Sequence, residues 1–261
     1  MKPSLEGMLE EMGLSPVWVL RDSPEVVQKG SAAKSKSMPR GKKPQMQATD
    51  GEVRTMPSVV VQTPERPDDV EEMGWQDLYR SIHDCRACGL CNGRKQAVPG
   101  IGDGSADWLF IGEGPGAEED MRGEPFVGQA GKLLDAMLSG IDLKRGEDVY
   151  IANAVKCRPP GNRTPDASEM AACFPFLQRQ IILIQPKLII LLGRAAVHAV
   201  LGQEGSLASL RGKNLTYRNG EQEIPVLVTY HPAYLLRNLP DKAKAWEDLC
   251  HARKLMHSLR E

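Results

Sequence analysis

Short runs of apolar residues alternate with amphipathic segments over the last two thirds of the chain. Four apolar runs predict buried strands, at residues 107–112, 149–155, 187–193 and 224–230. Segments with helical spacing of apolar residues predict helices over 130–141, 166–184, 194–202 and 243–259. Buried strands that alternate with helices are typical of a mostly parallel sheet covered on both faces. We therefore expect an α/β fold, with three αβα layers around a mostly parallel four-stranded central sheet.

The first seventy residues follow a different pattern. Residues 1–20 have apolar side chains at roughly helical spacing, which predicts one short helix. Residues 21–69 are rich in Ser, Pro, Lys, Gln and Thr, and the stretch 29–44 is basic and contains no acid. This composition predicts a disordered linker, which either acts only as a spacer or holds the protein near DNA through its charge. The folded domain is expected over 70–261 and should open with a helix at 74–85.

Composition narrows the class of protein only modestly. The chain has 261 residues and a formal net charge of -1, so any contact with DNA must come from local segregation of charge. No apolar stretch approaches the ~20 residues of a membrane span, and the N-terminus lacks the features of a signal peptide. We therefore expect a cytoplasmic protein without a membrane segment. No heptads are seen, so a monomer is expected.

Cysteine spacing is the most informative pattern. Cys85 and Cys88 form a C-x2-C pair, and Cys157 and Cys173 follow some seventy residues later. In the cytoplasm cysteines indicate metal ligands or free thiols rather than disulfides. Thiolates are soft ligands that select Zn, Cu(I) or iron–sulfur centres, so four of them could hold one site together. Cys91 extends the pair to C-x2-C-x2-C and could compete as a ligand, whereas Cys157 and Cys173 could also be plain buried cysteines.

Polar residues stand where the predicted strands end, which is where parallel sheets bind ligands. Glu113 follows the first strand and is either a general base or an exposed loop carboxylate. Asn153 ends the second strand, and its amide can present one donor and one acceptor to a nucleobase. His231 follows the fourth strand and either polarises a carbonyl group or is a structural histidine. The glycine loop at 112–116 is not a dinucleotide fingerprint, and no Walker lysine follows it.

Four segments taken together resemble family 4 of the uracil-DNA glycosylase superfamily, the iron–sulfur family. They are GEGPG at 112–116, EPFVG at 124–128, NAVKCRPPGNRTP at 153–165 and HPAYLLR at 231–237, with the C-x2-C pair upstream. The resemblance covers roughly residues 76–258. It implies a monofunctional enzyme that flips deoxyuridine out of DNA and hydrolyses its N-glycosidic bond, leaving an abasic site for base excision repair.

The resemblance also implies a role for individual residues. Phe126 would stack on the uracil, and Asn153 would read its O4 and N3–H. His231 would stabilise the charge that grows on uracil O2, and Glu113 would orient water or stabilise the cationic sugar. The remaining substrate-binding positions would be the loop glycines Gly112 and Gly114.

A structural 4Fe–4S cluster is implied as the cofactor, with Cys85, Cys88, Cys157 and Cys173 as its ligands. The expected partner is uracil-containing DNA, single- or double-stranded, whereas a partner of the N-terminal arm stays open. Residues proposed to contact DNA phosphates are Arg158, Arg163 and Arg237.

Three positions depart from the commonest pattern of the family: Gly114, Gln129 and Ala233 stand where Ala, Arg and Ser are frequent. The departures at Gln129 and Ala233 affect the expected contacts with DNA phosphates or the docking of the loop, and they leave the expected chemistry unchanged. One alternative from another class is a non-catalytic iron–sulfur module that binds DNA or is recruited to a repair partner through the N-terminal arm. A zinc-ribbon-like DNA binder is a weaker alternative, because the ligand spacing is unequal and the α/β core is large.

Overall fold

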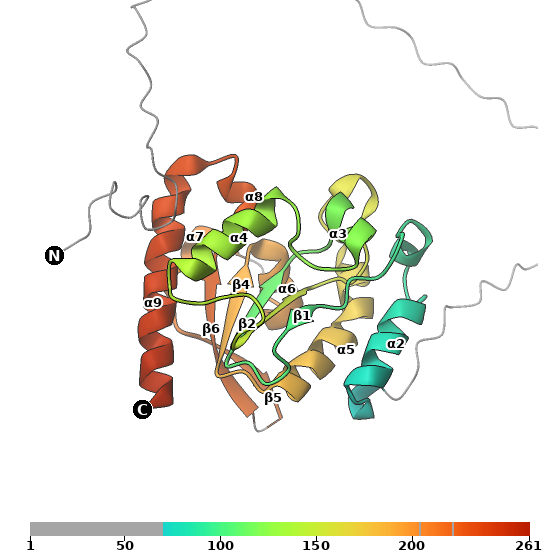
Figure 1. Cartoon of the computed structure of the whole chain (residues 1–261), viewed down its shortest axis with the longest axis horizontal. Coiled ribbons are helices and arrows are strands. Elements are labelled where there is room, and N and C mark those ends of the chain that lie inside the picture. The colour runs from blue at the N-terminus through green and yellow to red at the C-terminus, as the bar shows by residue number, and fades with distance from the viewer. Residues whose placement is uncertain (1–69, 204, 221) are drawn as a thin grey trace, which may run out of the picture. The chain divides into compact units, whose positions relative to one another are not determined.

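The sheet of the folded domain has six strands in the order β1-β3-β2-β4-β6-β5. A computed structural model describes residues 70–203, 205–220 and 222–261, and all of them fall in one unit. The helix predicted for 1–20 and the linker predicted for 21–69 lie outside the described residues. The three-layer α/β prediction is confirmed, because helices cover both faces of this sheet (Figure 1).

The four predicted strands form the centre of the sheet and run parallel to one another. They are β3 (Val149–Asn153), β2 (Trp108–Gly112), β4 (Leu188–Leu192) and β6 (Gln222–Thr229). The prediction of four strands was too low by two. The edge strands β1 (Ile101–Gly102) and β5 (Leu215–Asn219) pair antiparallel to β3 and β6. Neither edge strand has the run of apolar residues that would predict it. The strand β1 has only two residues, and most residues of β5 are exposed or half-buried.

Alternating side chains of the central strands face two separate cores. One core packs them against α4 (Gln129–Ser139), α8 (Pro232–Leu235) and the C-terminal helix α9 (Lys242–Arg260). The other packs them against α5 (Ala167–Ile184) and α6 (Arg194–Leu201). Figure 1 shows α9 along one side of the sheet and α5 along the other.

A third apolar cluster lies outside the sheet, where α2 (Trp75–Asp84) packs against α5. It also contains the chain that leaves β3. Asp166 precedes α5 as its N-cap and forms a capping box with Glu169, which satisfies backbone N–H groups at the start of the helix. The shorter elements are η1 (Val70–Glu72), η2 (Gly89–Asn92), α3 (Ala117–Arg122), η3 (Pro160–Asn162), α7 (Leu207–Leu210) and η4 (Leu239–Asp241). None of the described helices is long and apolar enough to cross a membrane.

Candidate active site

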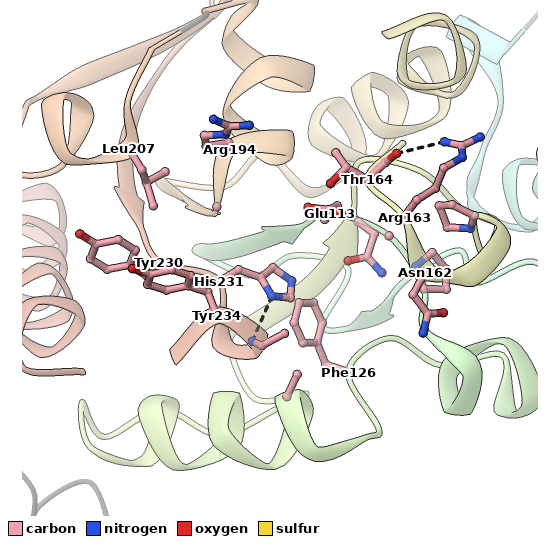
Figure 2. A pocket seen from close by; sticks show the side chains of 18 of the residues that line it. Glu113, Phe126, Asn162, Arg163, Thr164, Arg194, Leu207, Tyr230, His231 and Tyr234 are labelled. Atoms are coloured by element: carbon pink, nitrogen blue, oxygen red, sulfur yellow. Dashed lines mark hydrogen bonds between the residues drawn. The ribbon is translucent and has the colours of Figure 1, made fainter. Parts of the chain in front are cut away.

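A cavity of about 770 Å³ opens where the central parallel strands end. Its walls come from the segments that follow β2, β3, β4 and β6, together with the loop before α4. Figure 2 shows Glu113, Phe126 and His231 gathered around it. The four polar or aromatic residues that the sequence singled out, Glu113, Phe126, Asn153 and His231, therefore line one cavity.

Gly112 leaves a narrow space between Asn153 and Phe126. A Cβ atom at Gly112 would lie 2.5 Å from Asn153 Oδ1 and 2.5 Å from Phe126 Cζ, closer than real Cβ contacts come. A Cβ at Gly114 would likewise meet Val155 Cγ2 at 2.8 Å. Both glycines thus allow the loop after β2 to approach the end of β3. The absent side chain of Gly112 keeps the amide and the ring close together.

The Asn153 side chain is buried, with 2% of its surface exposed, and its Oδ1 has no hydrogen-bond partner among the described residues. A buried amide oxygen without a partner costs about 1–3 kcal/mol, which a ligand that donates to it would recover. The backbone of Asn153 is fixed from behind. Lys156, itself buried, donates from Nζ to the Asn153 carbonyl at 2.9 Å and to Gln180 Oε1 at 2.7 Å. Asn153 therefore lines the cavity from a rigid strand end and carries an acceptor without a partner among the described residues.

Phe126 lies in the left-handed backbone region, with φ of 54°. This conformation is uncommon outside glycine and persists only where neighbours hold it. Arg145 supplies that support, because its guanidinium donates to the carbonyls of Pro125 and Phe126, both at 2.8 Å. Glu119 holds the next turn by accepting from the backbone N–H groups of Val127 and Gly128 at 3.0 Å. The ring is thus fixed as one flat wall of the cavity.

His231 presents a neutral imidazole whose tautomer follows from its contacts. Its Nδ1 accepts a hydrogen bond from the Ala233 N–H at 3.2 Å, so the proton of the neutral ring is on Nε2. Burial, helped by the positive charge of Arg237 and opposed by the charge of Glu119, lowers the pKa of His231 to about 4. The ring stacks against Phe126 with 5.5 Å between centroids. At neutral pH the residue is therefore a fixed N–H donor rather than a cation.

The lowered pKa of His231 predicts a loss of stability in weak acid. The unfolded chain takes up the proton at pH about 6.5 and the folded protein only near pH 4, so stability is fully present above 6.5 and falls toward 4. Between pH 7 and pH 4.5, the wild type should lose about 2 kcal/mol more unfolding free energy than His231→Gln. Urea denaturation of both proteins at the two pH values measures this difference. Equal losses would contradict a His231 that the folded protein holds neutral.

Glu113 follows β2 and is only partly buried. Burial raises its pKa, while a hydrogen bond from the Thr164 side chain and the charge of Arg194 act in the opposite direction. Both neighbours line the same cavity, and Figure 2 shows Thr164 beside Glu113. Sequence reasoning missed Thr164, Arg194 and Arg145, because each lies in a loop or at a helix start without a distinguishing pattern.

The arginines predicted to contact DNA lie near the cavity but differ in their partners. Arg163 and Arg237 line it, and Arg237 is exposed. The guanidinium of Arg163 is engaged by both carboxylate oxygens of Glu169, at 2.8 and 2.6 Å. Arg158 donates from Nε to Asn162 Oδ1 at 2.7 Å. Arg237 is thus the least engaged of the three.

The four predicted metal ligands share the third apolar cluster. Cys157 and Cys173 are buried in it, and Cys85 and Cys88 pack against it. Arg94 connects two of the segments, because it donates to Cys157 Sγ at 2.8 Å and to the Cys85 carbonyl at 3.0 Å. The Lys156 N–H points at Cys173 Sγ at 3.3 Å. Burial raises the pKa of Cys157 to about 11 and of Cys173 to about 12.

Within the described residues, no three His, Cys, Asp or Glu side chains are already grouped as ligands around a single ion. The thiols are nonetheless close enough to influence one another, since Cys85 and Cys88 both raise the pKa of Cys157. An iron–sulfur cluster is bulkier than a single ion and holds its sulfur ligands farther apart. Four thiols around one apolar cluster, with N–H donors aimed at three of the sulfur atoms, those of Cys85, Cys157 and Cys173, fit such a group.

Comparison with known proteins agrees with this geometry. Residues 99–250, more than half of the chain, match the model of the uracil DNA glycosylase superfamily. Type-4 uracil-DNA glycosylase of Sulfurisphaera tokodaii is 42% identical over 66% of this chain and 80% of its own length. The type-4 enzyme of Thermotoga maritima is 46% identical over 60% of this chain and 80% of its own. A type-5 uracil-DNA glycosylase of Thermus thermophilus is 33% identical over 59% and 86%. The chain belongs to the type-4 family of the uracil DNA glycosylase superfamily.

Proposed function

We propose that this protein is a monofunctional uracil-DNA glycosylase that acts in base excision repair. Membership of the family supports the reaction class. The observation that carries the proposal for this chain is the unpartnered, buried Oδ1 of Asn153, a residue that lines one cavity together with Phe126, His231 and Glu113. A flipped-out uracil fits these groups, because it offers a flat ring, an N3–H donor and two carbonyl acceptors.

Recognition of the base follows from the Asn153 amide. Its Oδ1 would accept from uracil N3–H, and its Nδ2 would donate to O4. Cytosine has an unprotonated N3 and an amino group at position 4, so both contacts would fail. A mispaired buried amide costs about 1–3 kcal/mol, which corresponds to roughly a tenfold to hundredfold preference for uracil. Phe126 would stack on the ring and exclude water from its face.

Departure of the base follows from His231. As the C1′–N1 bond breaks, its electron pair moves onto the uracil and negative charge grows on O2. The neutral Nε2–H of His231 would donate to that oxygen and stabilise the charge in a cavity shielded from water. Uracil then leaves as an anion, which takes a proton from solvent.

Addition of water follows from Glu113. The water oxygen forms the new bond to C1′ as the C1′–N1 bond breaks, and a water proton passes to the Glu113 carboxylate. The products are free uracil and an abasic sugar with a hydroxyl at C1′. Before that transfer the same carboxylate faces the positive charge that develops on the sugar, so both proposed roles require the ionised form.

The four cysteines, Cys85, Cys88, Cys157 and Cys173, would hold a 4Fe–4S cluster. When bound, the cluster would link the α2 turn, the end of β3 and α5 through metal–thiolate bonds. The segment between Cys157 and Cys173 contains the residues 159 and 162–164, which line the cavity. Because two ligands of the cluster would stand at the ends of this segment, the cluster would fix one wall of the cavity. In this proposal the cluster has a structural role and does not take part in hydrolysis.

The DNA would lie over the mouth of the cavity. Arg158 and Arg237 would contact phosphates, and Arg163 would contribute its charge while it holds the loop through Glu169. The substrate would be uracil in single- or double-stranded DNA. We further propose that the enzyme is a cytoplasmic monomer, that residues 70–261 form the catalytic domain, and that residues 1–69 serve as a terminal helix and linker.

Excision from a single-stranded oligonucleotide with one uracil tests this function. Strand scission at the uracil after alkali is expected with the wild type, and Asn153→Ala should excise about 10²-fold more slowly, because it loses the contacts that read the base. Asn214→Ala, at an exposed position that lines neither this cavity nor its rim, is the matched control. No scission by cluster-replete wild type would favour a non-catalytic iron–sulfur module, whereas full activity of Asn153→Ala would remove Asn153 from base reading.

A further inference from the structure

A second cavity of about 360 Å³ adjoins the first and shares the three residues Glu113, Thr164 and Arg194 with it. Its remaining walls come from α5, α6 and the segment that leads into and through α7. Glu113 therefore contacts two spaces, of which only the first contains Phe126, Asn153 and His231.

Polar groups on the walls of the second cavity suit water. The Glu113 carboxylate accepts from the Thr164 hydroxyl and lies near the Arg194 guanidinium. His198 lines the cavity, and its buried Nδ1 has no partner among the described residues. A water site needs about 30 Å³ per molecule and two to four polar partners, and both requirements are met for several waters. An apolar ligand would leave these groups unpaired.

The reaction itself creates a need for such a space. Each turnover consumes one water, yet in the proposed complex the flipped nucleotide occupies the base-reading side of the first cavity and DNA covers its mouth. The nucleophile must then reach Glu113 from a side that the substrate does not occupy. The second cavity meets Glu113 and extends to exposed residues, Gln203 and Gly205, away from the base-reading groups.

We propose that the second cavity is a water site that supplies the nucleophile to Glu113, and that Thr164 and Arg194 are positioning residues for its carboxylate. This inference rests on the proposed glycosylase function. It assigns the bound species as water, held by Glu113, Thr164 and His198. It also gives the polar residues after β3 and β4 a task in hydrolysis that is separate from reading the base.

A plug at the outer end of the cavity tests the supply of water. A Cβ at Gly205 would meet Leu210 Cδ1 and Ser209 Oγ at 3.7 Å, an ordinary contact, so a side chain can leave the backbone there beside a wall of the cavity. Gly205→Phe should lower the single-turnover excision rate about tenfold, with the Kd for the uracil oligonucleotide changed by less than about threefold. Gly205→Ala should keep the rate. Asn214→Phe adds the same ring to an exposed site that lines neither cavity and is the matched control.

A second pair of variants tests the positioning of the carboxylate. Thr164→Val removes the hydroxyl at equal size and should lower the single-turnover rate about tenfold at unchanged Kd, whereas Thr164→Ser should restore it. Wild-type rates for both Gly205→Phe and Thr164→Val would overturn the water site while leaving the glycosylase function in place. Absence of excision by the wild type would instead overturn the function itself.

Discussion

Replacing His231 by alanine is expected to lower the single-turnover rate of uracil excision by about 10²- to 10³-fold, the range typical for loss of one donor to a developing oxyanion. The expectation rests on the tautomer that the Ala233 N–H imposes, which leaves Nε2–H facing the cavity. It also rests on the pKa of about 4, which keeps the ring neutral at working pH. A neutral donor stabilises uracil O2 only as charge grows there, so the loss should fall on the chemical step.

Rapid quench of enzyme in excess over a uracil oligonucleotide measures this rate directly. His257→Ala removes an exposed histidine from α9 and should react like the wild type. The Kd of His231→Ala for the oligonucleotide should stay within about threefold of the wild type, because the contact strengthens in the transition state. A rate within about threefold of the wild type would show that His231 does not stabilise the leaving base.

Replacing Cys173 by alanine is expected to abolish the iron–sulfur absorbance near 400 nm and to destabilise the domain. Cys173 comes from α5 and would join that helix to the end of β3, where the Lys156 N–H already points at its sulfur. Loss of a metal centre belongs to the few single changes that cost more than about 4 kcal/mol, which for a domain of this size lowers Tm by roughly 10 °C.

Iron content, the visible spectrum and thermal unfolding of protein purified without oxygen measure the outcome. Cys250 lies on α9 and outside the third apolar cluster. Cys250→Ala should therefore keep the absorbance near 400 nm, and its Tm should stay within a few degrees of the wild type. Full iron content in Cys173→Ala would remove that residue from the ligand set. Cys91, which is half-buried beside the C-x2-C pair, would then be the first replacement to examine.

The central sheet and main helices could be predicted from the sequence because each carries a strong apolar pattern. The strand predicted at 107–112 and the helix predicted at 166–184 match β2 and α5 closely. The edge strands β1 and β5 were missed, since an edge needs only backbone pairing on one side and few buried side chains. Their formation depends on a neighbour that is already in place, which a local pattern does not encode.

The candidate site was predictable to a similar extent. Residues after strand ends could be identified because parallel strands bring their carboxyl ends to one edge. The supporting residues were not, since Arg145 meets Phe126 only through the fold. The same holds for the second cavity, whose other walls come from segments 51 to 97 residues beyond Glu113 in the chain.

The space over Gly112 also bears on how this enzyme can evolve. Even alanine would bring an atom to 2.5 Å from both the Asn153 amide and the Phe126 ring, and every other amino acid contains that same atom. No single substitution at Gly112 can therefore change the distance between the Asn153 amide and the Phe126 ring in small steps. A lineage that comes to prefer another base must change a different wall, such as Ala130, which lines the cavity from α4. A library designed for altered base preference should hold Gly112 constant and vary that side of the cavity.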